Sequence, residues 1–254
     1  MAFLPDRSYA PATVSAGEVD QGLRSYMLRV YNWMSSGLAL TGIVAYAIYS
    51  TNLRGLFWAT DYSRGYAIPQ PTMLGLAAIF APLAFVLVLS FGINRLSRTA
   101  SQALFWLFSA AMGASLSSIF IKYQMGSIAQ VFFITAGTFA AMSAWGYATR
   151  RDLTAMGSFL MMGLIGIILA SVVNMFIGSA MTQFVISILG VLIFTGLTAY
   201  DTQRIKADYM EYSYAAGTDV AAKRSVMDAL TLYLNFINLF TLLLQLFGGR
   251  NSNN

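Results

Sequence analysis

The sequence contains no cysteine and no histidine. Without cysteine, the chain can form no disulfide, no thiolate zinc site and no cysteine nucleophile. Without histidine, it has no Ser-His or Cys-His dyad, no HExxH metalloprotease motif and no imidazole base. These absences exclude most hydrolytic reactions that membrane enzymes perform, and they leave carboxylates as the groups on which any response to pH must rest.

Charged residues are also scarce. Fifteen Lys and Arg and ten Asp and Glu make up 10% of the 254 residues, whereas soluble domains carry charge on about a quarter of theirs. Hydrophobic residues make up 57%, and the mean hydropathy is +0.64. Because so few charges cannot cover a soluble surface of this size, the sequence indicates an integral membrane protein with the lipid bilayer as its partner. The basic residues are scattered between apolar blocks, so no nucleic acid is expected as a partner.

Seven apolar blocks approach the ~20 residues that a spanning helix needs. They are Tyr31–Ser50, Thr72–Phe91, Ser101–Ile121, Ile128–Thr149, Ala155–Ile177, Thr182–Tyr200 and Met227–Phe247. The blocks are continuously apolar and do not alternate, which favours helices over a barrel. Small residues at helical spacing, such as Ser109 with Gly113 and Ala140 with Ala144, predict faces where helices pack closely. The predicted fold class is therefore an all-α polytopic membrane protein with seven transmembrane helices.

Basic residues between the blocks predict the orientation of the chain. With seven spans, the side with four basic residues carries Arg54, Arg64, Lys122 and Arg250, and the other side carries the remaining eleven. The positive-inside rule then places the amino terminus in the cytoplasm and the carboxyl terminus outside. We expect residues 1–24 to be a loose cytoplasmic tail, residues 25–249 to form the seven-helix domain and residues 250–254 to be a short outside tail.

Asp201 is the ionisable residue whose position most strongly suggests a function. It directly follows the apolar run VLIFTGLTAY at the end of the sixth block, and a charge at membrane depth usually marks a functional site. The carboxyl end of a helix is also unfavourable for an anion, because the helix dipole is negative there. The alternative is a boundary carboxylate that pairs with Arg204, three residues further on.

Other polar residues lie at comparable depth. Arg95 ends the second block, either as a functional residue or as a side chain that snorkels to the surface. Asp228 lies at the start of the seventh block, where the helix dipole suits an acid. In the alternating topology, a cytoplasmic-side cluster of Arg95, Asp201 and Asn235 is geometrically possible. Asparagines inside apolar blocks commonly form interhelical hydrogen bonds, and we expect this of Asn174, Asn235 and Asn238.

Five segments, found in order along the chain, carry a family resemblance. They are AAMGASLSSIF, GYATRRDLTAMGSF, IGIILASVVNMF, GLTAYDTQRIK and ALTLYLNFINLFTLLLQLFG. These segments resemble the Bax inhibitor-1 (TMBIM) family and are closest to its bacterial inner-membrane branch. The resemblance runs from about Gly22 to Gly249 and so covers nearly the whole chain.

The resemblance implies six helices around a central seventh helix, an inner-membrane location and a pH-sensitive calcium leak. It also implies a pore gate in which an aspartate of the sixth-helix YD motif pairs with an aspartate of the seventh-helix LYLDFINLF motif. An arginine at the end of the second helix latches this gate. By their motifs, these positions are Asp201, Asn235 and Arg95. Because Asn235 replaces the second aspartate, we expect Asp201 to accept a hydrogen bond from it and to titrate as a single group.

We therefore expect calcium as the one ligand, a permeant ion that Asp201 would contact. We expect no cofactor. The alternative function is a non-conducting membrane regulator or chaperone that binds other membrane proteins, for which the connection between Arg204 and Val226 offers a docking surface. An enzyme is not expected. An aspartyl protease needs two intramembrane carboxylates, a serine-lysine dyad needs a lysine at depth, and a retinal pigment needs a lysine in the seventh span, which has none.

Overall fold

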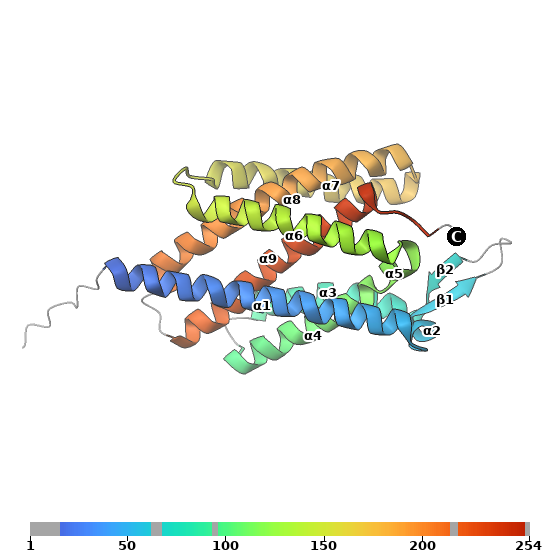
Figure 1. Ribbon diagram of the computed structural model, residues 1–254, viewed down its shortest axis with the longest axis horizontal. Helices are drawn as coiled ribbons and strands as arrows, with labels where there is room; N and C mark the ends of the chain where they lie inside the picture. The colour runs from blue at the N-terminus through green and yellow to red at the C-terminus, as the bar shows by residue number, and fades with distance from the viewer. Residues whose placement is uncertain (1–15, 62–67, 93–95, 214–217, 252–254) are drawn as a thin grey trace, which may run out of the picture.

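The computed structural model describes residues 16–61, 68–92, 96–213 and 218–251. Long helices run back and forth along one axis, and a small hairpin lies at one end of the bundle (Figure 1). The elements are α1 (Ala16–Ser50), α2 (Arg54–Phe57), β1 (Trp58–Asp61), β2 (Ile68–Pro71), α3 (Met73–Gly92), α4 (Arg98–Leu116), α5 (Ser118–Lys122), α6 (Met125–Ala148), α7 (Thr154–Ile177), α8 (Ala180–Asp208), the π-helix η1 (Tyr209–Ser213) and α9 (Thr218–Phe247). Each apolar block of the sequence lies in helix apart from single residues at its ends or at a junction, which confirms the all-α prediction.

Six of these helices are long and apolar enough to cross a membrane. They comprise α3, α4 with α5, α6, α7, α8 and α9. The helix that holds the first predicted block, α1, has 35 residues but is less apolar and is not among the six. The fold is therefore a helical membrane bundle with six candidate spans, and the seventh predicted span is not confirmed.

Helix α9 lies at the centre of the bundle. It packs against α1, α4, α6 and α8, and in Figure 1 it crosses the bundle obliquely between them. Of its most apolar stretch 56% is buried, whereas the same measure is 6% for α7. In a bilayer the most apolar helices, such as α7, can face lipid, whereas α9 is less apolar and carries polar side chains that need partners inside the bundle. This explains why α9 forms the core and positions side chains for several neighbours.

Glycines allow two of the closest helix crossings. A Cβ on Gly146 of α6 would lie 2.2 Å from the carbonyl oxygen of Ala199 in α8, and one on Gly113 of α4 would lie 2.7 Å from that of Thr41 in α1. The predicted face at Ser109 and Gly113 therefore does pack closely, as small residues do between membrane helices.

Parts of both predicted tails, residues 16–24 and 250–251, belong to the described residues. The first 24 residues were expected to be loose, but α1 is already helical at Ala16. At the other end of the chain, the backbone N–H of Gln124 donates to the carbonyl oxygen of Gly249 at 2.9 Å, and that of Asn251 donates to Lys122 at 3.1 Å. The segment after α9 is thus tied to the junction of α5 and α6, because its backbone groups find partners there.

Candidate functional site

A buried polar group joins α8 and α9. Asp201 of α8 is 4% exposed and Asn235 of α9 is 5% exposed. The Asn235 Nδ2 atom donates a hydrogen bond to Asp201 Oδ2 at 2.7 Å. The other carboxylate oxygen, Oδ1, lies 3.0 Å from a guanidinium nitrogen of Arg204. Both oxygens of this buried carboxylate are therefore engaged, as an anion in an apolar bundle requires.

The position of Asp201 in its helix differs from the prediction. The sixth block was expected to end near Tyr200, which would put the carboxylate at the negative end of a helix dipole. Instead α8 continues to Asp208, so Asp201 lies inside the helix and the argument from the dipole does not apply. Within the continued helix, Arg204 lies about one turn further on and reaches back to the carboxylate, an i, i+3 contact that helical spacing allows.

The structure contains the pairing with Arg204 that was the alternative explanation for Asp201. The Arg204 side chain is 41% exposed, and its guanidinium lies 5.8 Å from the centre of the Tyr200 ring. One face of this cation thus contacts a buried acid and another reaches the surface. Arg95, the third residue of the expected gate, lies outside the described residues.

A cavity of about 700 Å³ opens between α7, α8 and α9 beside this group. Asp201 and Arg204 line one end of it. Polar side chains of α9 continue along the cavity at spacings of three and four residues, which places them on one face of the helix. This polar stripe consists of Thr231, Asn235, Asn238, Thr241 and Gln245.

A second polar cluster lies at the other end of the cavity. The Gln183 Nε2 atom of α8 donates to Gln245 Oε1 at 2.8 Å, and the Ser187 hydroxyl donates to the same oxygen at 3.1 Å. Asn174 of α7 donates to Gln183 Oε1 at 3.4 Å. Asn174 and Asn235 therefore both form interhelical hydrogen bonds.

The described residues of this site offer a cation few ligands, so they suit weak rather than permanent binding. Among the described residues, no group of three or more His, Cys, Asp or Glu is placed to hold a metal ion, and Asp201 is the one carboxylate on the described wall of the cavity. Calcium takes six to eight oxygen ligands, so one carboxylate with amide and hydroxyl oxygens makes a weak site. Such a set of groups suits an ion pathway better than a resident metal centre.

Asp228 is a second buried carboxylate, and its position in its helix differs from the prediction. Asp228 was placed at the start of a helix, but α9 begins at Thr218 and Asp228 lies well inside it, 8% exposed. The Tyr26 hydroxyl of α1 donates to Asp228 Oδ2 at 2.5 Å. The AAKR run from Ala221 to Arg224 was the signal that the helix starts early, because alanine, lysine and arginine are strong helix formers.

Comparison with known sequences agrees with this architecture. Inner membrane protein YbhL of Escherichia coli is 45% identical over 240 residues, which cover 94% of this chain and 98% of that protein. A protein of Caulobacter vibrioides is 44% identical over 250 residues, with 96% and 97% covered. A sequence model of the family described as inhibitor of apoptosis-promoting Bax1 matches residues 23–252. This chain therefore belongs to the Bax inhibitor-1 family of membrane proteins.

Proposed function

We propose that this protein is a pH-sensitive cation leak of the bacterial inner membrane, with calcium as the permeant ion. It acts as a passive pathway, and no step of the proposal is catalytic or uses a cofactor. The observation that carries the proposal is the cavity between α7, α8 and α9, because polar side chains line it from Asp201 to Gln245. Polar side chains at membrane depth are costly and mark ion and substrate pathways.

The dimensions of the polar stripe support a pathway. Asn235 and Gln245 are ten residues apart on α9, and at the rise of an α-helix this corresponds to about 15 Å. That distance is half of the ~30 Å hydrocarbon core. The stripe thus offers oxygen ligands through one half of the membrane, and the group around Asp201 closes its inner end.

Asp201 is the proposed gate. In the closed state its two oxygens bind Asn235 and Arg204 at 2.7 and 3.0 Å. An incoming cation competes with Arg204, whose half-exposed side chain can leave toward the surface. Protonation of Asp201 removes the negative charge that attracts both Arg204 and the incoming cation. The leak therefore depends on pH through a carboxylate, in a chain without histidine. Arg95 acts in this proposal as a second latch on the same carboxylate.

The proposed topology has seven spans, with α1 as the first. In Figure 1 the described start of α1 and the end of the chain lie at opposite ends of the bundle, as an odd number of crossings requires. The excess of basic residues on one side then places the amino terminus in the cytoplasm. The inner-membrane location follows the printed description of the relative from Escherichia coli.

The test is ion flux through purified protein in liposomes. Parent protein, Asp201→Asn and Asp152→Asn are reconstituted with a calcium-sensitive dye inside, and flux is measured between pH 5 and 8. Asp152 is the matched control, because hydrogen bonds from Thr154 hold the pKa of this exposed carboxyl below its ordinary value, outside the spans and away from the cavity.

We expect flux in the parent and in Asp152→Asn with the same dependence on pH, and a flat pH profile in Asp201→Asn. The absence of calcium flux in the parent at every pH would overturn the leak and favour the non-conducting regulator. A parent profile that Asp201→Asn leaves unchanged would instead remove Asp201 from the gate.

A further inference from the structure

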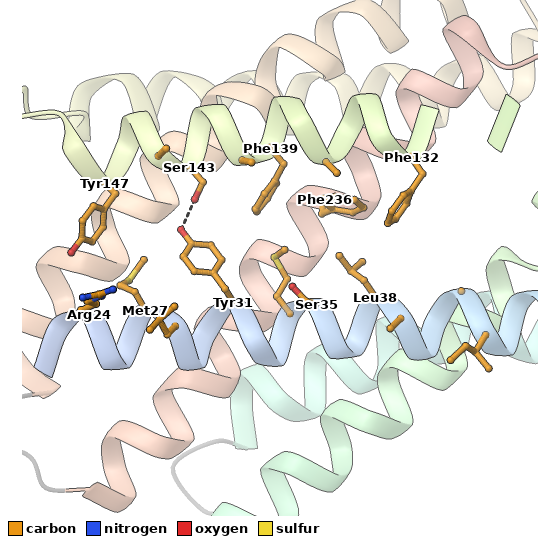
Figure 2. A pocket seen from close by; sticks show the side chains of 18 residues that line it. Arg24, Met27, Tyr31, Ser35, Leu38, Phe132, Phe139, Ser143, Tyr147 and Phe236 are labelled. Atoms are coloured by element: carbon orange, nitrogen blue, oxygen red, sulfur yellow. Dashed lines mark hydrogen bonds between the residues drawn. The ribbon is translucent and has the colours of Figure 1, made fainter. Parts of the chain in front are cut away.

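A second, larger cavity lies on the opposite side of α9, between α1 and α6. It has a volume of about 1080 Å³, and Figure 2 shows it as a groove with α1 on one side and α6 on the other. Most of the side chains that line it are apolar, among them Met27, Leu38, Phe132, Phe139 and Phe236. The groove is separate from the polar cavity, because the two share no lining residue.

Small residues give the groove its depth. Ala140 and Ala144 of α6 and Gly42 of α1 all line it, and a Cβ on Gly42 would meet nothing within 4 Å. The alanine pair was expected to be a face for close helix packing. Instead α1 lies away from α6 here, and the small side chains leave a channel that an extended hydrocarbon chain can enter.

The groove has the length of one membrane leaflet. On α6 it extends from Tyr147, next to the end of the helix at Ala148, to Phe132. These sixteen residues span about 22 Å of helix. One leaflet contributes half of the ~30 Å hydrocarbon core, and the headgroup region adds several ångströms. A single acyl chain with its headgroup therefore matches this length.

Positive charge gathers at the Tyr147 end of the groove. Figure 2 shows Arg24 of α1 facing Tyr147 of α6 across this end. Beside it, Lys206 Nζ donates to the Tyr147 carbonyl oxygen at 3.0 Å and lies 4.8 Å from the centre of its ring. Within the described part of the chain, neither cation forms a salt bridge with an acid. An apolar channel with Arg24 at its mouth and Lys206 beside Tyr147 at the same end is complementary to an anionic amphiphile.

We propose that this groove binds one anionic phospholipid of the cytoplasmic leaflet. One acyl chain lies along α1 and α6 over Phe139 and Phe236, and the phosphate contacts Arg24 and Lys206. The hydrogen-bonded pair of Tyr31 and Ser143 crosses the groove beneath this chain. A second copy of the protein is a poorer occupant, since its own basic cytoplasmic end would approach the same cations. The inference does not depend on the proposed leak.

Native mass spectrometry tests the lipid site. Purified parent protein is mixed with equal amounts of phosphatidylglycerol and phosphatidylcholine of the same chain length, and the bound adducts are compared. Arg24→Gln removes the headgroup contact, and Ala140→Phe fills the channel. The matched controls are Arg29→Gln, an exposed arginine of α1 that does not line the groove, and Gly137→Phe on α6, where a Cβ would meet only open space.

The parent and both controls should retain one phosphatidylglycerol in preference to phosphatidylcholine. Arg24→Gln should lower that preference by about fivefold, the effect of one basic residue near an anionic headgroup. Ala140→Phe should lose the adduct of either lipid. Gly42→Leu fills the same channel from α1 and replaces Ala140→Phe if the latter does not elute from a sizing column as the parent does.

Three outcomes would overturn the proposal. Equal retention of the two lipids by the parent would show that the mouth does not select an anion. An equal loss in Arg29→Gln and Arg24→Gln would show a general charge effect. A dimer in the parent that Ala140→Phe converts to a monomer would show that a second copy occupies the groove.

Discussion

The hydroxyl of Tyr26 in α1 donates a hydrogen bond to the carboxylate of Asp228 in α9, across 2.5 Å and 202 positions of sequence. Both side chains are buried. The Tyr26 ring also packs on Tyr209 of η1, with 4.7 Å between ring centres. This contact therefore fixes the start of the first long helix to the central helix and to the end of α8.

Replacing Tyr26 with phenylalanine should destabilise the protein. The change leaves a buried carboxylate without one donor, which costs about 1–3 kcal/mol. For a chain of this size, each kcal/mol corresponds to a shift in Tm of about 2–4 °C. A thermal unfolding curve in detergent measures the difference. Tyr46→Phe is the control, because Tyr46 is 51% exposed; equal Tm values for the two variants would contradict a role of the hydrogen bond.

Two glycines of α6 should respond in opposite ways to the same substitution. Gly146→Ala places a methyl group 2.2 Å from the carbonyl oxygen of Ala199 and should cost about 1–3 kcal/mol, because α6 and α8 must separate. Gly137→Ala meets open space and should stabilise the helix by up to about 1 kcal/mol. Thermal unfolding of the two variants side by side checks this contrast. If Gly146→Ala is as stable as Gly137→Ala, then the crossing of α6 and α8 is not tight.

Restoring a second carboxylate should change how the leak responds to pH. In Asn235→Asp the new group lies where the amide now contacts Asp201 at 2.7 Å, and two carboxylates at that distance titrate as a coupled pair. We expect a shifted pH profile of calcium flux, with stronger calcium binding when both groups are ionised. Asn238→Asp, which adds an acid to the same cavity, is the control. Identical profiles for the parent and Asn235→Asp would argue against titration at this site.

Removing the partner of Asp201 should raise the basal leak. Arg204→Gln deletes the ion pair of 3.0 Å. Partly exposed ion pairs contribute about 1 kcal/mol or less, so we expect an increase in flux of up to about fivefold. The same assay on Arg95→Ala shows whether that residue is a second latch. Unchanged flux in Arg204→Gln, together with a rise in Arg95→Ala, would assign the latch to Arg95 alone.

Most of the helical architecture follows from the sequence, because each apolar block is long enough to fix a helix by itself. That Asn235 lies inside a helix also follows, since its position can be counted from the start of the seventh block. The lengths of α8 and α9 do not follow from the sequence in this way. Both helices continue through polar residues, and a search for apolar blocks stops at the first charge, as it did at Asp201.

The partners of polar residues were harder to predict. Asn235 and Asp201 belong to motifs that lie on neighbouring helices, so their hydrogen bond could be expected. The bond between Tyr26 and Asp228 could not, because Tyr26 precedes the first apolar block and nothing in the sequence shows that this part of the chain lies beside Asp228. Periodicity shows which face of a helix is apolar but does not show which helix covers it.

By itself, the sequence determined that the chain is a helical membrane protein, which helices it has and how scarce its charges are. Hydropathy and charge are local properties of the chain, so each apolar block predicts its own helix. The tertiary structure alone decided that Asp201 binds Asn235 and Arg204 at the same time, one on each oxygen, that polar side chains of α9 line a cavity, and that α1 and α6 leave a groove with Arg24 at its mouth. These features depend on how helices cross, and crossings are set by the fit of many side chains at once.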